Sequence, residues 1–312
     1  KKEIELWRNN YEVTLERLKE EMNPQSSISF QRFIYDTILS SPSKDSTRKN
    51  KMSTLSLLSQ FRPGLSFKGI TPTLIHYFEN FLYEKGHKVN TVAKHMKHLK
   101  SFVNSAIDQG HIRIQDYPFQ RYKAKRAKGK STHLLAEEIQ KLENLVLSGR
   151  AQSLTHTLEA FLFCCYTGLR YSDFTNLSEK NIIITQKKPW IILNTVKTGT
   201  EVKLPLSLLF EGKAWNLLQK HKGQWNEFFN LKTNSTVNKE LIRIASLAGI
   251  EKHFSFHSAR HACATLLIYN GANITTVQKL LGHRNVATTQ IYSNIMESTV
   301  VKDLKKCAKE KR

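Results

Sequence analysis

Several features that mark particular protein classes are scarce or absent in this sequence. Only four of the 312 residues are cysteines, and none has CxxC spacing. We therefore predict buried thiols in a reducing compartment and no disulfide framework. With 13 glycines and 7 prolines, the chain is neither collagen-like nor of low complexity. No charged-then-apolar leader opens it, and the longest apolar stretch, residues 158–169, is too short to span a bilayer. We therefore expect no membrane association and a cytoplasmic location.

Acidic residues are also few. The chain has 26 Asp and Glu against 48 Lys and Arg, which gives a net charge of +22. Basic residues are shared equally, with 24 up to position 130 and 24 after it. A balance of this size favours a polyanionic partner, most often nucleic acid. The alternative is a basic protein without a nucleic-acid role, or a ribosome-associated factor.

Apolar periodicity predicts helices across the first 120 residues. They are expected at 1–22, 28–40, 46–60, 72–85 and 91–109. One face of the last helix is basic and hydroxylated, which suits contact with DNA phosphates and groove edges, although an ordinary solvated face has the same composition. Its candidate DNA-binding residues are Lys94, Lys97, His98 and Ser101.

Residues 121–130 read RYKAKRAKGK, six of them basic, with no hydrophobic period. This composition predicts a linker between two domains that also follows the DNA backbone. Its candidate DNA-binding residues are Arg121, Lys123, Lys125, Arg126, Lys128 and Lys130.

The second half is predicted to be mainly helical with one small antiparallel sheet. Helices are expected at 135–147, 153–166, 171–177, 207–222, 237–248, 257–270, 274–281 and 287–291. Strands are expected at 181–185, 190–196 and 201–206, with a turn at Lys197. The fold class is therefore mainly α, with a small antiparallel β-sheet in the second domain.

Four short segments of this half carry residues of chemical interest. Arg170 follows the glycine that ends an apolar helix, and His257 and Arg260 share one face at the start of another. His283 follows a second helix-ending glycine, and Tyr292 lies nine residues later. Each segment alone has an ordinary structural explanation, as a helix cap, a surface pair or a core tyrosine.

Together these residues suit phosphoryl transfer. Two arginines and two histidines can surround the oxygens of a pentavalent phosphorus, and a tyrosine can form a covalent phosphodiester. A lysine on the hairpin can protonate the departing 5′ oxygen. The spacing of His257 and His261 also resembles a helical zinc pair, but a serine stands where zinc proteases need glutamate. No hydrolase, P-loop or dinucleotide motif is present, so we predict no metal and no cofactor.

In this order and spacing the motifs resemble the tyrosine recombinase (phage integrase) family, most closely the integrases and invertases of bacterial mobile elements. The likeness covers residues 24 to 300. It implies that Arg170, Lys197, His257, Arg260, His283 and Tyr292 are catalytic. It further implies that Asp173 braces the first arginine; Lys203 is a weaker candidate for the hairpin lysine.

The resemblance also implies a two-domain DNA clamp. Residues 1–23 would form an amphipathic helix or linker, 24–120 an α-helical core-binding (SAM-like) domain, 121–131 the basic linker and 132–312 the catalytic domain. An arm-binding domain, which many relatives carry before this point, is expected to be missing or cut away. The expected partners are double-stranded DNA with inverted half-sites, three further protomers in a synaptic homotetramer and a DNA-bending host factor, all at the nucleoid.

The tail after Tyr292 is charged but has a helical stripe of apolar residues. The stripe consists of Val300, Val301, Leu304 and Ala308. We expect it to dock in trans onto a neighbouring protomer, the alternative being packing in cis. The predicted activity is site-specific recombination through a 3′-phosphotyrosyl intermediate and a Holliday junction. The alternatives are a type IB topoisomerase-like enzyme and a non-catalytic DNA-binding regulator on the same fold.

Overall fold

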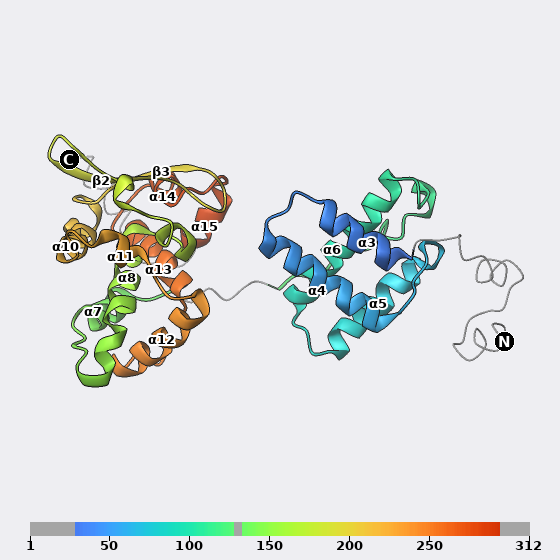
Figure 1. Cartoon of the computed structure of the whole chain (residues 1–312), viewed down its shortest axis with the longest axis horizontal. Helices are drawn as coiled ribbons and strands as arrows, with labels where there is room; N and C mark the ends of the chain where they lie inside the picture. The colour runs from blue at the N-terminus through green and yellow to red at the C-terminus, as the bar shows by residue number, and fades with distance from the viewer. Residues whose placement is uncertain (1–28, 128–132, 294–312) are drawn as a thin grey trace, which may run out of the picture. The chain divides into compact units, whose positions relative to one another are not determined.

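The computed structural model describes residues 29–127 and 133–293. The chain divides into two compact units, Lys1–Gly129 and Lys130–Arg312, each with its own hydrophobic core (Figure 1). The helix predicted at 1–22, the tail stripe at 300–308, Lys128 and Lys130 lie outside the described residues. Within the described ranges, no helix is long and apolar enough to cross a membrane.

The first unit is helical in all of its described regular structure. Its elements are α3 (Phe30–Ser40), α4 (Asp45–Phe61), η1 (Phe67–Gly69), α5 (Pro72–Glu84), α6 (Val89–Asp108) and η2 (Ile114–Asp116). Local sequence determines where two of these helices begin. The Ser29 hydroxyl accepts the Arg32 N–H at the start of α3, and the Thr71 hydroxyl caps α5, whose first residue is Pro72.

The apolar face of α6 lies in the core of this unit, as its periodicity predicts. Val92, Met96, Leu99 and Val103 are each at most 1% exposed. They pack with the aromatic side chains of α3 and α5 in one cluster. The opposite face of α6, which carries most of its lysines, is left to solvent.

The basic segment 121–127 is attached to the first unit at two points. The side-chain amide of Asn90 donates to the Ala127 carbonyl and accepts the Ala127 N–H, both at 3.0 Å. The Tyr122 hydroxyl donates to Glu79 at 2.8 Å. These bonds fix the path of the segment and leave its cationic side chains exposed.

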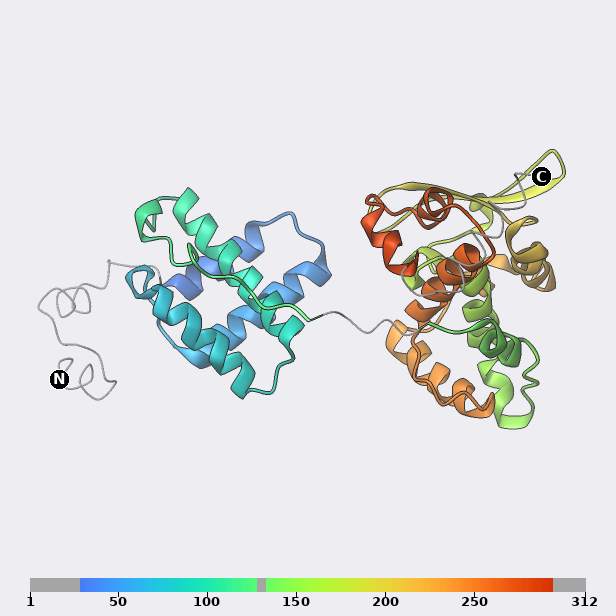
Figure 2. The same ribbon diagram turned by 180° about the vertical axis from the view of Figure 1, so that it is seen from behind.

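The second unit is built around the apolar helix α8. Its helices are α7 (Ala136–Glu143), η3 (Gly149–Leu154), α8 (Thr155–Thr167), α9 (Tyr171–Phe174), η4 (Glu179–Asn181), η5 (Leu209–Gly212), α10 (Lys213–Lys220), α11 (Trp225–Phe229), α12 (Asn234–Leu247), α13 (Phe256–Tyr269), α14 (Ile274–Leu281) and α15 (Ala287–Ser293). Nearly all of α8 is buried, because α7, α10, α11, α12 and α13 pack against it (Figure 1, and Figure 2 from behind). A helix that is apolar on all sides belongs at the centre of a domain.

The predicted antiparallel sheet is confirmed, with the order β1-β2-β3. Its strands are β1 (Ile182–Thr185), β2 (Lys188–Asn194) and β3 (Glu201–Pro205). Ile182 pairs with Ile191, and Asn194 pairs with Glu201 at the end of the second hairpin. Buried and exposed residues alternate along β2 and β3, so one face of the sheet packs on the core. The register places the loop 195–200 at the end of the sheet, where it connects β2 to β3.

Three predicted helices are shorter than expected. The helix expected at 135–147 ends as α7 at Glu143. The helix expected at 171–177 is a single turn, α9. The helix expected at 207–222 begins as α10 at Lys213, because Phe210 and Glu211 adopt left-handed backbone angles with φ of 48° and 58°. A non-glycine residue in that region cannot continue a right-handed helix. The mainly α fold with one small sheet is as predicted.

Candidate active site

The junction after α8 positions Arg170. Gly168 ends the helix with φ of 70°, and a Cβ atom at this position would lie 2.5 Å from Leu281 Cδ2. Only glycine fits here, because both the backbone angle and the close approach exclude a side chain. Arg170 follows in an extended conformation and precedes α9.

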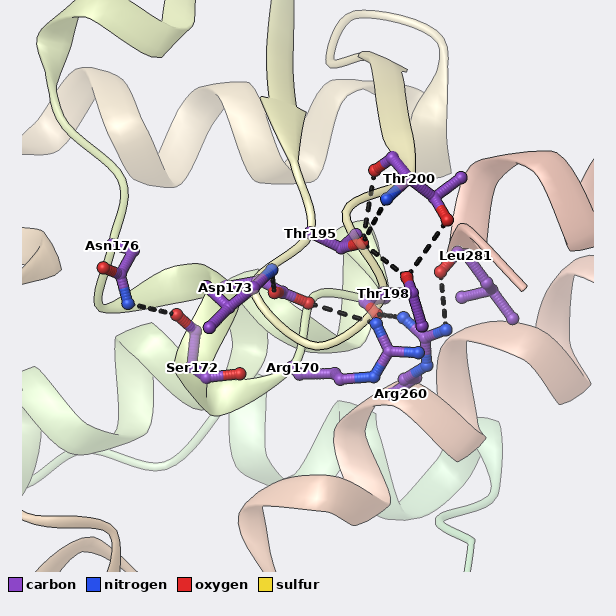
Figure 3. A network of polar contacts seen from close by, with 11 residues as sticks. Arg170, Ser172, Asp173, Asn176, Thr195, Thr198, Thr200, Arg260 and Leu281 are labelled. Carbon is purple, nitrogen blue, oxygen red and sulfur yellow. Dashed lines mark hydrogen bonds and ion pairs between the residues drawn. The ribbon is translucent and has the colours of Figure 1, made fainter. Parts of the chain in front are cut away.

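Asp173 connects Arg170 to the β2–β3 hairpin. Its Oδ2 lies 3.3 Å from Arg170 Nη1, and its Oδ1 accepts the Val196 N–H at 2.9 Å. The Asp173 side chain is fully buried and that of Arg170 is 15% exposed. One carboxylate therefore orients the guanidinium and holds the loop that carries Lys197 (Figure 3).

Three threonines shape the hairpin loop itself. The Thr195 and Thr198 hydroxyls are 2.7 Å apart, and the Thr200 hydroxyl donates to Thr198 at 3.1 Å (Figure 3). The Thr200 N–H also donates to Thr195 Oγ1 at 3.1 Å. Lys197 lies within this loop and is exposed. The loop is therefore bonded internally while its lysine stays free to meet a substrate.

The loop is also attached to the segment after α14. Arg284 donates to the Thr198 carbonyl. A Cβ atom on Gly282 would lie 2.7 Å from Val202 Cγ2 and 3.2 Å from Thr195 Cγ2. The turn that carries His283 thus packs tightly on the hairpin. Lys203, the weaker lysine candidate, is exposed on β3 beside Glu201 at 3.4 Å.

Arg260 is the buried cation of the cluster, with an exposed fraction of 3%. Its Nη1 donates to the Gly168 carbonyl at 2.8 Å and its Nη2 to the Leu281 carbonyl at 2.6 Å (Figure 3). Burial, followed by the charge of Arg170, lowers the pKa of Arg260 to about 10. The guanidinium therefore remains charged at neutral pH and lies close to Arg170.

His257 is the solvent-exposed histidine of the cluster. Desolvation of its ring lowers its pKa, and neighbouring cations lower it further. These cations are Arg260, Arg170 and Lys197. Three positive charges therefore lie within electrostatic reach of His257, an environment that suits an anion.

His283 also lies within electrostatic reach of the two arginines. Its Nδ1 lies 2.9 Å from the Thr289 hydroxyl. Burial lowers the pKa of His283 to about 4, with Arg260 and Arg170 as the next causes. The imidazole is therefore neutral at pH 7, and the contact with Thr289 fixes the orientation of its ring.

Tyr292 comes from α15 and is 4% exposed. Its side chain packs with residues of α13 and α14 in a small separate cluster. Its hydroxyl lies 2.8 Å from His261 Nδ1. Burial raises the pKa of the phenol, while the charges of Arg260 and Arg170 act to lower it. The phenol is therefore within electrostatic reach of both arginines.

The structure brings the six predicted catalytic residues of the second unit together, with Asp173 beside them. Sequence reasoning missed two contributors, His261 as a contact of Tyr292 and Arg284 as an anchor of the hairpin. The only available signal for His261 was its spacing from His257, which was considered for zinc. Within the described residues, no group of three or more His, Cys, Asp or Glu side chains could hold a metal ion.

The predicted DNA-binding residues of the first unit are mostly exposed. Lys94, Lys97 and Ser101 reach solvent on α6, and Lys94 Nζ donates to Asn50 Oδ1 at 3.3 Å. His98 differs, because it is half-buried and its Nδ1 lies 2.8 Å from the Thr54 hydroxyl. Burial, followed by nearby lysine charges, lowers its pKa. The exposed members of segment 121–127 are Arg121, Lys123, Lys125 and Arg126.

Comparisons with known proteins match both units. The phage integrase family matches residues 132–298, and the phage integrase SAM-like domain matches residues 29–125. The tyrosine recombinase XerD of Listeria monocytogenes serotype 4b is 29% identical over 237 residues, which cover 70% of this chain and 76% of that protein. The tyrosine recombinase XerC of Halalkalibacterium halodurans is 26% identical, covering 74% of this chain and 79% of that protein.

Solved structures show the same fold. A lambda integrase tetramer bound to a Holliday junction superposes with a TM-score of 0.73 at 21% identity, covering 93% of this chain and 83% of that chain. The Tn1549 transposon integrase in complex with transposon right end DNA gives a TM-score of 0.69 at 17% identity, covering 90% of this chain and 100% of that chain.

Proposed function

The chain belongs to the phage integrase family and is a site-specific tyrosine recombinase, and from this premise we propose the chemistry of its strand exchange. Tyr292 attacks a DNA phosphate, which gives a 3′-phosphotyrosyl bond and a free 5′ hydroxyl. The observation that carries the proposal is the position of the buried phenol within reach of the charges of Arg170 and Arg260. A nucleophile beside two guanidinium groups is what in-line attack on a phosphodiester requires.

The other residues have complementary roles in this proposal. Arg170, Arg260, His257 and His283 hold the non-bridging oxygens, whose charge grows as phosphorus becomes pentavalent. Lys197 protonates the departing 5′ oxygen from the hairpin loop. Asp173 positions both Arg170 and the loop. The freed hydroxyl then attacks the 3′-phosphotyrosyl phosphorus of the partner duplex and displaces Tyr292, and the reaction proceeds through a Holliday junction without metal or cofactor.

We extend the proposal to assembly and location. Two protomers bind inverted half-sites, and two such dimers form a homotetramer. Each protomer contacts the DNA through the basic side chains of residues 24–120 and 121–131. The lambda integrase tetramer on a Holliday junction supports this arrangement by its shared fold. In this proposal the tail docks in trans onto a neighbouring protomer, and a host factor bends the DNA. The protein originates in a mobile element and acts at the nucleoid.

A trapping experiment tests the nucleophile. The protein is incubated with a pool of randomised duplexes that carry a central nick, so that the short cleaved strand diffuses away. SDS-stable protein–DNA adducts are isolated and their DNA is sequenced. We expect adducts enriched in an inverted repeat, and we expect Tyr292→Phe to bind the recovered DNA normally without forming any adduct. Tyr77→Phe, which removes a phenol hydroxyl that is exposed in the first unit, serves as the control.

The outcomes separate the alternatives. Adduct formation by Tyr292→Phe would reject Tyr292 as the nucleophile. Tight binding without adducts from the unmodified protein would indicate a non-catalytic regulator. Relaxation of supercoiled plasmid that carries the recovered site, without exchange between two sites, would indicate a topoisomerase-like activity.

A further inference from the structure

His261 is a titratable side chain in direct contact with the proposed nucleophile. It lies on α13, one residue after Arg260, and its Nδ1 is 2.8 Å from the Tyr292 hydroxyl. The centroids of the two rings are 5.4 Å apart. On its other side, the His257 ring meets the His261 ring edge-on at 4.8 Å. His261 therefore contacts both the exposed His257 and the buried phenol.

The protonation states of this pair suit proton transfer from oxygen to nitrogen. Burial, followed by electrostatic repulsion from His257, Arg260 and His133, lowers the pKa of His261 to about 4. Burial raises the pKa of the Tyr292 phenol. At pH 7 the imidazole is therefore neutral and the phenol is protonated. A neutral ring nitrogen can accept the phenol proton and leaves the oxygen lone pairs free for phosphorus.

We propose that His261 is a catalytic residue that takes the proton of Tyr292 during cleavage and returns it during rejoining. The inference rests on Tyr292 being the nucleophile of the proposed function. As the O–H bond breaks, the proton moves to His261 Nδ1 and the electron pair of the phenol oxygen forms the bond to phosphorus. The P–O5′ bond then breaks, and its electron pair takes a proton from Lys197. Rejoining reverses both transfers.

DNA itself makes His261 a stronger base. In the free protein, burial and then the nearby positive charge of Arg260 oppose formation of an imidazolium ion. A bound phosphodiester brings a negative charge beside the same cations, and a second one develops on phosphorus in the transition state. Both charges favour the protonated imidazole. The phenol is thus activated only when a phosphate occupies the site.

The other histidines of the cluster are placed for different contacts. His283 directs its Nδ1 to the Thr289 hydroxyl, and the exposed His257 has its ring against His261. Both lie where they can meet non-bridging phosphate oxygens. The contact with the phenol oxygen identifies His261 as the residue that takes its proton.

The test is single-turnover cleavage of the inverted-repeat DNA recovered from the adducts. His261→Ala removes the base, and we expect cleavage to slow by roughly 10² to 10⁴-fold. Added imidazole should restore the rate, and substituted imidazoles should do so in the order of their pKa values. His261→Asn keeps a polar group near the Nδ1 position but cannot take a proton, so it should remain slow. His253→Ala removes an exposed histidine elsewhere and should cleave normally.

The results separate this inference from the proposed function. If Tyr292→Phe still forms adducts, the nucleophile is wrong and the proposed function fails. If Tyr292→Phe is inactive and His261→Ala cleaves at the normal rate, only the role of His261 is refuted. A normal rate for His261→Asn would reduce His261 to a hydrogen-bonding contact. If His261→Ala does not fold, the cleavage rate of His261→Asn still decides whether His261 takes the phenol proton.

Discussion

Arg260 has a structural role as well as its proposed catalytic one. Its guanidinium donates to the carbonyls of Gly168 and Leu281, which lie at the carboxyl ends of α8 and α14. Carbonyls at these ends lack partners within their own helices, and a cation is favoured there by the helix dipole. Arg260 therefore fixes α8, α13 and α14 relative to one another, and its remaining N–H groups are left for a phosphate. Lysine could not replace it, because it lacks the planar fork.

The proposed acid role of Lys197 has a sharp chemical test. A DNA strand with sulfur in place of the 5′-bridging oxygen releases a thiolate, which leaves without a proton. We expect Lys197→Ala to cleave normal DNA roughly 10² to 10⁴-fold more slowly and to recover nearly full rate on the sulfur-substituted strand. The measurement is single-turnover cleavage of the two substrates in parallel.

Two variants frame this result. Arg170→Ala should remain slow on both substrates, because it removes charge stabilisation and leaves the leaving group unchanged. If Lys203→Ala is restored by sulfur and Lys197→Ala is not, the acid is the lysine on β3. Lys203 starts at a disadvantage, since it lies on the strand beside Glu201 rather than in the loop.

At the scale of elements, the β2–β3 hairpin is held from two sides. Asp173 binds the loop from α9 through the Val196 N–H, and Arg284 binds it from the segment after α14 through the Thr198 carbonyl. Lys197 lies between these two attachments. The position of the proposed acid therefore depends on Asp173 and Arg284.

This arrangement predicts that Arg284→Ala makes the position of Lys197 less fixed and leaves Arg170 and Arg260 in place. Loss of one charged hydrogen bond to the loop should slow cleavage of normal DNA by about tenfold. The defect should largely disappear on the sulfur-substituted strand, as for Lys197→Ala. Lys279→Ala is the matched control, because it removes one exposed positive charge from α14. An equal defect on both substrates would show that Arg284 acts on DNA binding instead.

Elements with strong local patterns were predictable, and contacts between distant segments were not. The three strands were recognised from β-branched runs with a turn at Lys197. The single turn α9 and the left-handed residues Phe210 and Glu211 have no local signal, because packing decides them. The same holds within the site. Motif spacing identified its candidates, but the contact of His261 with Tyr292 joins residues 31 positions apart.

At the scale of the whole molecule, both units bury neutral imidazoles. Burial lowers the pKa of His95 in the first unit to about 4, and also those of His261 and His283 in the second. Histidine in an unfolded chain titrates near pH 6.5. Between pH 4 and about pH 6.5, these histidines therefore bind protons in the unfolded chain and remain unprotonated in the folded chain. Stability contributed by these groups is therefore complete above about pH 6.5 and is lost as the pH falls toward 4.

We therefore expect the urea midpoint of the second unit to fall between pH 7.5 and about pH 5, above the range in which most carboxylates titrate. Tryptophan fluorescence can follow this unit, because three of the four tryptophans, Trp190, Trp215 and Trp225, lie in it. Replacing the fourth, Trp7→Phe, removes the remaining signal. In that background His261→Asn should flatten the pH dependence, since asparagine does not titrate, whereas His253→Ala should leave it unchanged. A midpoint that stays constant or rises on acidification would show that the imidazoles are not held neutral by the fold.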